Sequence, residues 1–202
     1  GYLAAGKGWN TKGKTLLKNP YAQFLKLEAN LVKTWSLSAH TSLVGHVNVG
    51  AVWTYGNSEE APYSEQFYVG GANSIRAFSI RGVGPGSYSN AGSADVYNLG
   101  RTGDLKFVAN LEYRPRLFGN LYGAVFLDAG NVWRMRDDGR EGAKFEFKNV
   151  LKEMALGTGV GLRYDLNFFM IRVDWGIGLH LPYETGKSGY YNIPRFKDGM
   201  GY

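Results

Sequence analysis

Charged side chains near the middle of the chain are the best candidates for a functional site. Arg76 and Arg81 lie in a glycine-rich stretch, residues 67–85, and the carboxylates Glu112 and Asp128 follow it. An arginine can hold a carboxylate through two parallel hydrogen bonds, and the pair is stronger where water is partly excluded. The residues themselves leave two interpretations open: a shielded arginine–carboxylate contact, or arginines on a solvated loop tip with both carboxylates facing water.

Patterns for catalysis or metal binding are missing from the sequence. His40, His46 and His180 are widely separated, and no HxxxH or carboxylate cluster has the spacing of metal ligands. The glycines within residues 82–86 are similar to a phosphate-binding loop, but they do not join a buried strand to a helix. We therefore expect no enzyme activity, no cofactor and no metal.

The composition fits one all-β domain without a disulfide framework. The chain has 202 residues, of which 29 are glycine and none is cysteine, and 15% are aromatic. The net charge of +6 comes from scattered lysines and arginines, so nucleic acid is not an expected partner. No run of about 18 apolar residues is present to form a transmembrane helix. A membrane role would therefore depend on strands.

Six segments show the period-2 alternation of β-strands, with an apolar face and a face that carries charges at mid-strand. Each is longer than the 5–6 residues that are common in soluble strands. The segments are residues 23–35, 42–55, 105–114, 121–133, 156–166 and 168–181. Alternation alone fits both a soluble sandwich and a membrane barrel, because either gives one polar and one apolar face.

The connections favour the membrane barrel. Residues 36–41, 115–120 and 165–167 are short, whereas residues 57–103, 134–155 and the tail from 182 are long. Outer-membrane barrels sort their connections in this way, and about 10 tilted residues span a bilayer as a strand. Aromatic residues at the strand ends are candidates for girdles at the two interfaces: Trp35, Trp53, Tyr55, Tyr113, Trp133, Tyr164 and Phe168.

Six strands are too few to close a barrel. An open sheet edge in hydrocarbon would leave backbone groups unpaired, and known bacterial barrels have at least 8 strands. We therefore expect the chain to be part of a larger antiparallel transmembrane β-barrel, or to close only by oligomerisation.

Two motifs resemble those of a known family. The pair Gly70 and Gly71 precedes Ile75-Arg76-Ala77-Phe78, and a later alternating segment carries Phe126-Leu127-Asp128-Ala129-Gly130. They resemble the (V/I)RG(F/Y) and FxDxG motifs of the BamA/TamA superfamily of outer-membrane assembly proteins, the bacterial surface antigen type. Their order matches, with one segment carrying Glu112 between them, and the resemblance covers residues 23–181.

One position departs from the family motif. Ala77 stands in place of its glycine, and residues 80–83 offer a competing copy around Arg81 that has the glycine but lacks the aromatic residue. Alanine is tolerated there unless the backbone needs a positive φ. We therefore expect Arg76 to be the arginine that enters the lumen, with Arg81 as the alternative if residue 77 has a positive φ.

The resemblance implies that Arg76 points into the barrel lumen and contacts Asp128, with Glu112, Phe126 and Gly130 beside the contact. It implies a sixteen-stranded barrel preceded by periplasmic POTRA domains. Residues 1–202 would be a partial barrel domain, with the six segments as strands ten to fifteen, a long extracellular loop at residues 57–103, and no POTRA domain.

The function that the resemblance implies is the insertion and assembly of β-barrel proteins in the outer membrane of a Gram-negative bacterium. The implied partners are outer-membrane lipid, unfolded β-barrel clients, and accessory proteins that bind the POTRA domains. Because neither seam strand is securely present, this fragment is expected to be inactive by itself. The alternatives are a secretion transporter of the same superfamily, a passive porin-type channel, and a soluble β-sheet binding protein.

Overall fold

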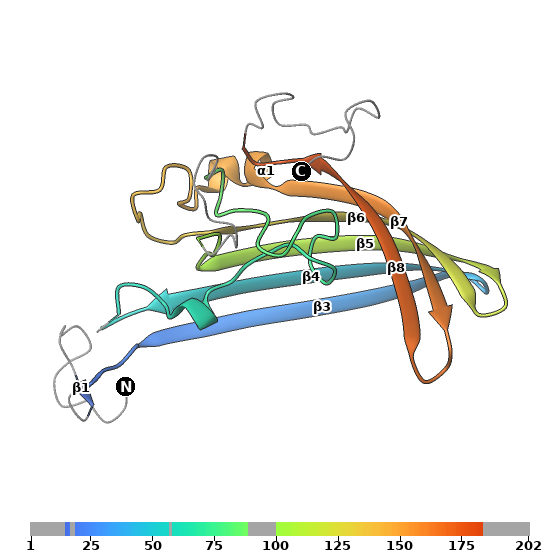
Figure 1. Cartoon of the computed structure of the whole chain (residues 1–202), viewed down its shortest axis with the longest axis horizontal. Helices are drawn as coiled ribbons and strands as arrows, with labels where there is room; N and C mark the ends of the chain where they lie inside the picture. Colours follow the sequence, from blue (N-terminus) through green and yellow to red (C-terminus); the bar gives the residue numbers. More distant parts are fainter. Residues whose placement is uncertain (1–14, 17–18, 57, 89–99, 184–202) are drawn as a thin grey trace.

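The computed structural model describes residues 15–16, 19–56, 58–88 and 100–183, and its main element is a curved antiparallel sheet (Figure 1). The strands are β3 (Phe24–Ser38), β4 (Thr41–Thr54), β5 (Leu105–Phe118), β6 (Leu121–Trp133), β7 (Ala155–Asp165) and β8 (Met170–His180). They pair in sequence order, with β3 and β8 at the two edges. The predicted all-β class and the six long strands are thus confirmed.

Two strands end three or four residues beyond the predicted segments because backbone pairing continues past the clear alternation, and the other boundaries agree to within two residues. β3 extends to Ser38, which pairs with Thr41 across a register shift. β5 extends through Pro115 to Phe118, with a second register shift near its end. Residues 1–20 are rich in Gly, Lys, Asn and Thr, which predicts a loop or a frayed end, but they contain the two-residue strands β1 (Thr15–Leu16) and β2 (Asn19–Pro20). The rest of that prediction lies outside the described residues.

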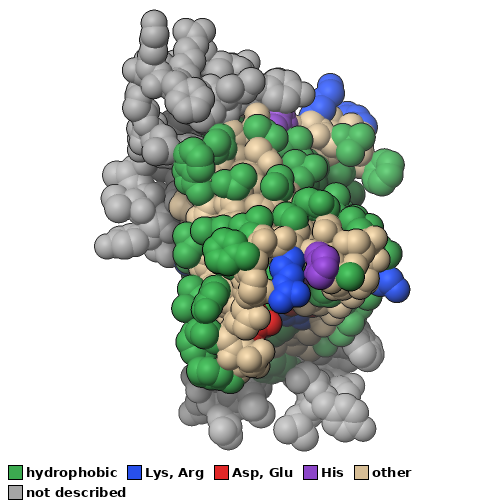
Figure 2. Space-filling model, turned by 90° about the vertical axis from the view of Figure 1, so that its right-hand side faces the viewer, with side chains coloured by type: hydrophobic (Ala, Val, Ile, Leu, Met, Phe, Trp, Pro, Cys, Tyr) green, Lys and Arg blue, Asp and Glu red, His purple; other side chains and the backbone are tan. Residues whose placement is uncertain are grey.

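The outward face of the sheet is apolar along most of its length. Side chains such as Leu27, Val125 and Val173 stay exposed although they are large and apolar, at 57%, 52% and 63%. Figure 2 views the short-turn end and shows hydrophobic side chains over much of that surface, with few lysines and arginines. A surface of this kind suits lipid contact, because an apolar area of this extent is unusual on a soluble monomer.

The described part of the long connection between β4 and β5, residues 58–88 and 100–104, folds over the concave face of the sheet, as the green trace in Figure 1 shows. It begins with a short 3-10 helix, η2 (Tyr63–Glu65), and Val69 and Val83 pair across it in an isolated bridge. The buried apolar core lies between this loop and the strands: Val52, Ala61, Phe67, Val69, Ile75, Val83, Val108, Val132 and Ala155. The loop, not a second sheet, therefore covers the inner face.

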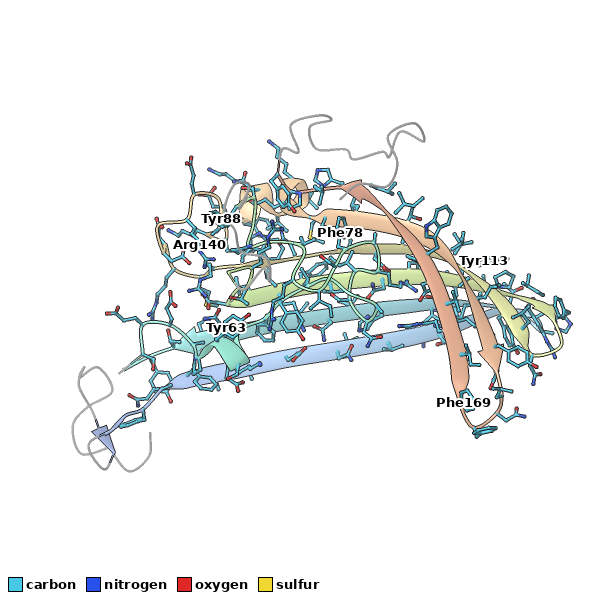
Figure 3. The ribbon with its side chains drawn as sticks, viewed as in Figure 1. Tyr63, Phe78, Tyr88, Tyr113, Arg140 and Phe169 are labelled. Atoms are coloured by element: carbon cyan, nitrogen blue, oxygen red, sulfur yellow. The ribbon has the colours of Figure 1, made fainter. Side chains whose placement is uncertain are left out.

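The connection between β6 and β7 lies at the same end of the sheet and contains η3 (Phe147–Asn149) and α1 (Val150–Glu153). Figure 3 shows Tyr63, Tyr88 and Arg140 at this long-loop end, and Tyr113 and Phe169 at the short-turn end. None of the helices in the described part of the chain has the length and apolarity needed to cross a bilayer.

The prediction that Trp133 belongs to an aromatic girdle is wrong, because its side chain is buried. Its side chain is only 2% exposed, because Phe145 packs edge-on against it at 5.7 Å between ring centroids. Trp35, Trp53 and Tyr113, by contrast, are exposed on the outward face. A residue at a strand end can point outward in the alternation and still be covered by a neighbouring loop, which the alternation does not reveal.

Candidate functional site

The tip of the long loop is a tight turn that only glycine permits at its start. Gly70 and Gly71 have φ values of 105° and 88°, in the region that L side chains rarely adopt. A Cβ on Gly70 would also collide with the carbonyl oxygen of Ser79. The backbone N–H of Gly71 donates to the Phe78 carbonyl at 2.8 Å, which closes residues 71–78 into a compact loop. The glycine pair therefore sets the position of Arg76.

Arg76 reaches the wall and holds Asp128 through a bidentate ion pair. Its Nε donates to Asp128 Oδ2 and its Nη2 to Asp128 Oδ1, each at 2.8 Å, and its backbone N–H donates to Oδ2 at 3.0 Å. Arg76 Nη1 also donates to Glu112 Oε2. The Asp128 side chain is fully buried, and those of Arg76 and Glu112 are 7% exposed. Of the two interpretations left open by the sequence, the solvated loop tip is therefore wrong.

Aromatic and apolar contacts complete the seat of the loop tip. The guanidinium of Arg76 lies over the ring of Phe126, with its Cζ 3.6 Å from the ring centroid. This geometry adds a cation–π attraction to the ion pair. Gly130, expected beside Arg76, lies instead beneath Ile75, where an added Cβ would come 3.1 Å from Ile75 Cδ1. Residues of the FxDxG motif thus contact two neighbouring side chains of the loop motif, Ile75 and Arg76.

Several polar residues of the site were missed as site residues by the sequence interpretation. Asn110 donates through Nδ2 to Asp128 Oδ1 at 2.8 Å and to the Ser74 carbonyl at 2.7 Å, so it ties the loop backbone to the same carboxylate. Arg163, only 1% exposed, donates to both oxygens of Glu112 at 3.1 and 3.2 Å. Both lie on the polar face predicted by the alternation, but their partners depend on strand register.

The network continues to the edge strand β8. Arg163 Nη1 lies 2.6 Å from Asp174 Oδ1, and Arg172 Nε lies 3.2 Å from Asp174 Oδ2. Arg172 Nη2 donates back to the loop, to the carbonyl of Ala72 at 2.9 Å and to Asn73. Arginine and carboxylate charges therefore alternate from the loop through β5, β6 and β7 to β8. The arrangement holds the loop against the inner wall.

The sequence of this chain matches a known protein family. A family model described as the Omp85 superfamily domain matches residues 7–202. The chain belongs to the Omp85 superfamily. The resemblance inferred from the two motifs is therefore confirmed at the level of the family.

Relatives of this Omp85 chain come from animals and from a bacterium. It is 28% identical over 141 residues to sorting and assembly machinery component 50 homolog A of Xenopus laevis, covering 68% of this chain and 28% of that protein. The human homolog is 31% identical over 105 residues, covering 50% and 21%. The structure of BamA from Haemophilus ducreyi lacking POTRA domains 1–3 has a similar fold, with a TM-score of 0.61 at 18% identity, covering 78% of this chain and 32% of that one. The Omp85 chain thus spans less than a third of each.

Ala77, the departure from the motif, fits its position in this Omp85 chain because its backbone does not need a positive φ; Arg81, by contrast, has a φ of 57°. Arg81 also lies elsewhere in the loop, stacked near Tyr63 and Tyr68 with its Cζ 5.1 and 4.7 Å from the ring centroids. Arg76 is therefore the arginine that contacts the inner wall.

Glycines on β7 and β8 make room for the motif. A Cβ on Gly157 would come 2.6 Å from Ala77 Cβ, and one on Gly176 would come 3.0 Å from Ala77 Cα. One on Gly178 would come 3.1 Å from the ring of Phe78. The period-2 alternation of β7 and β8 places all three glycines on the inner face. They are what lets the loop backbone approach the wall closely.

The three histidines form no metal centre. His46 Nδ1, on β4, lies 2.6 Å from Asn110 Oδ1, whereas His180 Nδ1, at the end of the edge strand β8, lies 2.6 Å from the carbonyl of Met154. Within the described ranges, no group of three or more His, Asp or Glu side chains is arranged to hold a metal ion. The expectation that no cofactor is needed stays a prediction.

A second buried cluster joins the two long loops. Trp133 Nε1 donates to Glu153 Oε2 at 2.6 Å. Asn131 Nδ2 donates to the carbonyl of Gly86 at 2.9 Å and to that of Glu153. Asn131 and Trp133 are at the end of β6, Glu153 is in α1, and Gly86 belongs to the long loop. The cluster therefore holds the base of the long loop and α1 at fixed positions on β6.

Glu153 should make this cluster weaken with rising pH. Burial raises the pKa of Glu153, and the Glu146 carboxylate adds to the effect, while hydrogen bonds from Trp133 and Ser87 oppose it. A carboxyl group with a raised pKa stabilises the fold most below its ordinary pKa, and this contribution is lost as pH rises through the raised value. Hydrogen exchange of residues 150–156, corrected for intrinsic rates, should become faster over that range. Glu153→Gln should remove the dependence; an identical pH profile in both proteins would exclude Glu153 as its source.

Proposed function

We propose that this chain is the loop-bearing part of an outer-membrane barrel that inserts and assembles other β-barrel proteins. The observation that carries the proposal is the Arg76–Asp128 ion pair, which holds an inward-folded loop against the wall in a chain of the Omp85 superfamily. Relatives named as sorting and assembly machinery components, and a fold similar to BamA, support the same function. The protein would use no covalent step and no cofactor.

The fixed loop argues against a passive porin. The loop covers the concave face of β4 to β6, and its contacts with the wall include buried ion pairs and an apolar core. A loop held in this way would obstruct the lumen of the complete barrel, whereas a porin needs an open, water-filled one. It would also brace the wall while strands elsewhere in the barrel separate to admit a client.

Sixteen strands, POTRA domains and a bacterial outer membrane remain part of the proposal. The described sheet has two free edges, which must be paired by further strands before it can stay in hydrocarbon. Accessory proteins would bind outside the barrel, on the POTRA domains. The sequence relatives named above are animal proteins. The bacterial origin of this chain therefore stays a prediction, which the sequence of the full gene and its neighbours would test.

The direct test is a folding assay with the full-length protein in lipid vesicles. A urea-denatured β-barrel client should fold into these vesicles faster than into protein-free ones, measured by the shift in gel mobility that folded barrels show before heating. Vesicles containing an unrelated porin at the same density are the control. Equal client folding rates in the two sets of vesicles, together with large steady single-channel conductance, would exclude assembly in favour of a pore.

A further inference from the structure

Lys33 is a charge on the face of the sheet that is otherwise apolar. It lies opposite Gly45 on β4, and the same outward row continues through Leu111 on β5 and Leu127 on β6. Among the outward positions of the six described strands, Lys33 is the only charged residue. A cation facing hydrocarbon is unfavourable unless its ammonium group reaches the interface or an anion.

Lys33 also differs from the inward-facing lysines in having no carboxylate partner among the described residues. Lys26, on the same strand, lies 3.3 Å from Glu65 Oε2. Lys106, on β5, lies 2.6 Å from Glu28 Oε1. The lysines of the inner face are thus neutralised within the protein, and the outward one is exposed.

A shallow groove of about 580 Å³ lies beside Lys33 on this outer surface. Apart from Lys33 its side-chain lining is mainly apolar, with Leu31, Trp35 and Val47 on the β3–β4 side and Leu111 and Leu127 on the other. Gly45 has no side chain to fill the groove, and the Trp35 ring lies over it. A Cβ added to Gly45 would come 2.9 Å from Trp35 Cζ3. The groove therefore offers an apolar channel with a cation at its border.

The position of Lys33 along the strand places its charge near the membrane interface. Trp35 and Tyr113 lie in one outward row near the short-turn ends of β3 and β5, and the same row reaches Trp175 at the middle of β8. Aromatic residues in such rows mark the level of the lipid head groups. Lys33 precedes Trp35 by two residues, about 7 Å along β3, and its flexible stem can extend the ammonium group toward the level of Trp35.

We propose that Lys33 and this groove bind one anionic phospholipid of the surrounding bilayer. The lipid phosphate would contact the ammonium group of Lys33, and one acyl chain would lie along Leu31, Val47 and Leu127. Charge complementarity favours an anionic lipid over a zwitterionic one, since the described residues supply no carboxylate to Lys33. The inference rests on the proposed membrane position of the sheet.

The test compares lipid selection by variants of the full-length protein. Each is reconstituted with equal amounts of phosphatidylglycerol and phosphatidylcholine, extracted mildly, and weighed by native mass spectrometry with its bound lipids. Lys33→Leu should lower the ratio of bound anionic to zwitterionic lipid about fivefold, the equivalent of about 1 kcal/mol for one basic residue at an anionic surface. Lys33→Arg should retain the ratio, and so should Lys26→Leu, which removes the same charge from the opposite face of β3.

Two outcomes would overturn the proposal. An unchanged ratio in Lys33→Leu would mean that Lys33 selects no lipid, as it would if a carboxylate elsewhere in the full-length protein neutralised it. An equal fall in Lys26→Leu would mean that total charge matters and not this groove. Flotation of the vesicles separates this failure from that of the proposed function, because a protein that does not insert in membranes would not float with either lipid.

Discussion

Replacing Asp128 by alanine in the full-length protein should detach the loop tip and lower the free energy of unfolding by about 3–5 kcal/mol, the usual loss when one partner of a buried ion pair is removed. Arg76 would keep its contact with Glu112, but its Nε and Nη2 donors and its backbone N–H would lose their common acceptor. Asn110 would lose the same acceptor. Urea unfolding in lipid vesicles measures the free energy, and client folding measures the function.

A double-mutant cycle shows whether Arg76 and Asp128 act as a pair. Arg76→Ala should cause a loss of similar size, and the double variant should be no worse than the poorer single one, because each single change already breaks the contact. Arg81→Ala is the matched control, since it removes an arginine from the same loop that stacks on Tyr63 and Tyr68 and does not hold the wall. Fully additive losses would mean that the two residues act separately.

Replacing Gly157 by alanine should push the loop away from β7, although it adds one methyl group. The new Cβ would lie 2.6 Å from Ala77 Cβ, much closer than two carbon atoms can approach. Overpacking of this kind destabilises a fold by about 1–3 kcal/mol. Limited proteolysis of the long loop and urea unfolding should both reveal the change. Gly123→Ala is the control, because its Cβ would make only an ordinary contact of 3.5 Å with Pro115.

The collision at Gly157 predicts a rescue. Ala77→Gly removes the methyl group that the new Cβ would meet, so the double variant Ala77→Gly/Gly157→Ala should recover most of the lost stability and protease resistance. By itself, Ala77→Gly should have a small effect, since the backbone of residue 77 needs no positive φ. If the double variant were as unstable as Gly157→Ala, the damage would come from β7 itself and not from the contact with the loop.

Strand number, strand order and the two faces of the sheet were predictable from the sequence because each depends on a local rule. A side chain changes face at every residue of a strand, so the alternation from Leu25 to Leu31 already separates inside from outside. Neighbouring segments joined by short turns can only pair as antiparallel strands. The ends of the strands were less certain, as at Ser38 and Phe118, because pairing continues where alternation fades.

Some contacts of the loop were also predictable from the sequence, and others were not. Two family motifs and the chemistry of arginine pointed to Arg76 and Asp128, but the residues themselves did not choose between a solvated and a shielded pair. Only the tertiary structure shows that Asn110, Arg163 and Arg172 join this network, because their partners depend on register and on the path of the loop.

The glycines show most clearly what each level of description decides. Gly70 and Gly71 could be recognised as turn residues from the sequence, because glycine adopts the positive φ values that a tight turn needs. Gly157 and Gly176 are equally necessary, because a side chain at either position would collide with Ala77. Ala77 is 80 to 100 residues away in the sequence, so only the fold reveals this contact. The sequence by itself determined a wall of long antiparallel strands with one apolar face, and the residues that could anchor a loop to it. Which side chains meet was decided by the fold, because the wall and the loop come into contact only after the strands have paired.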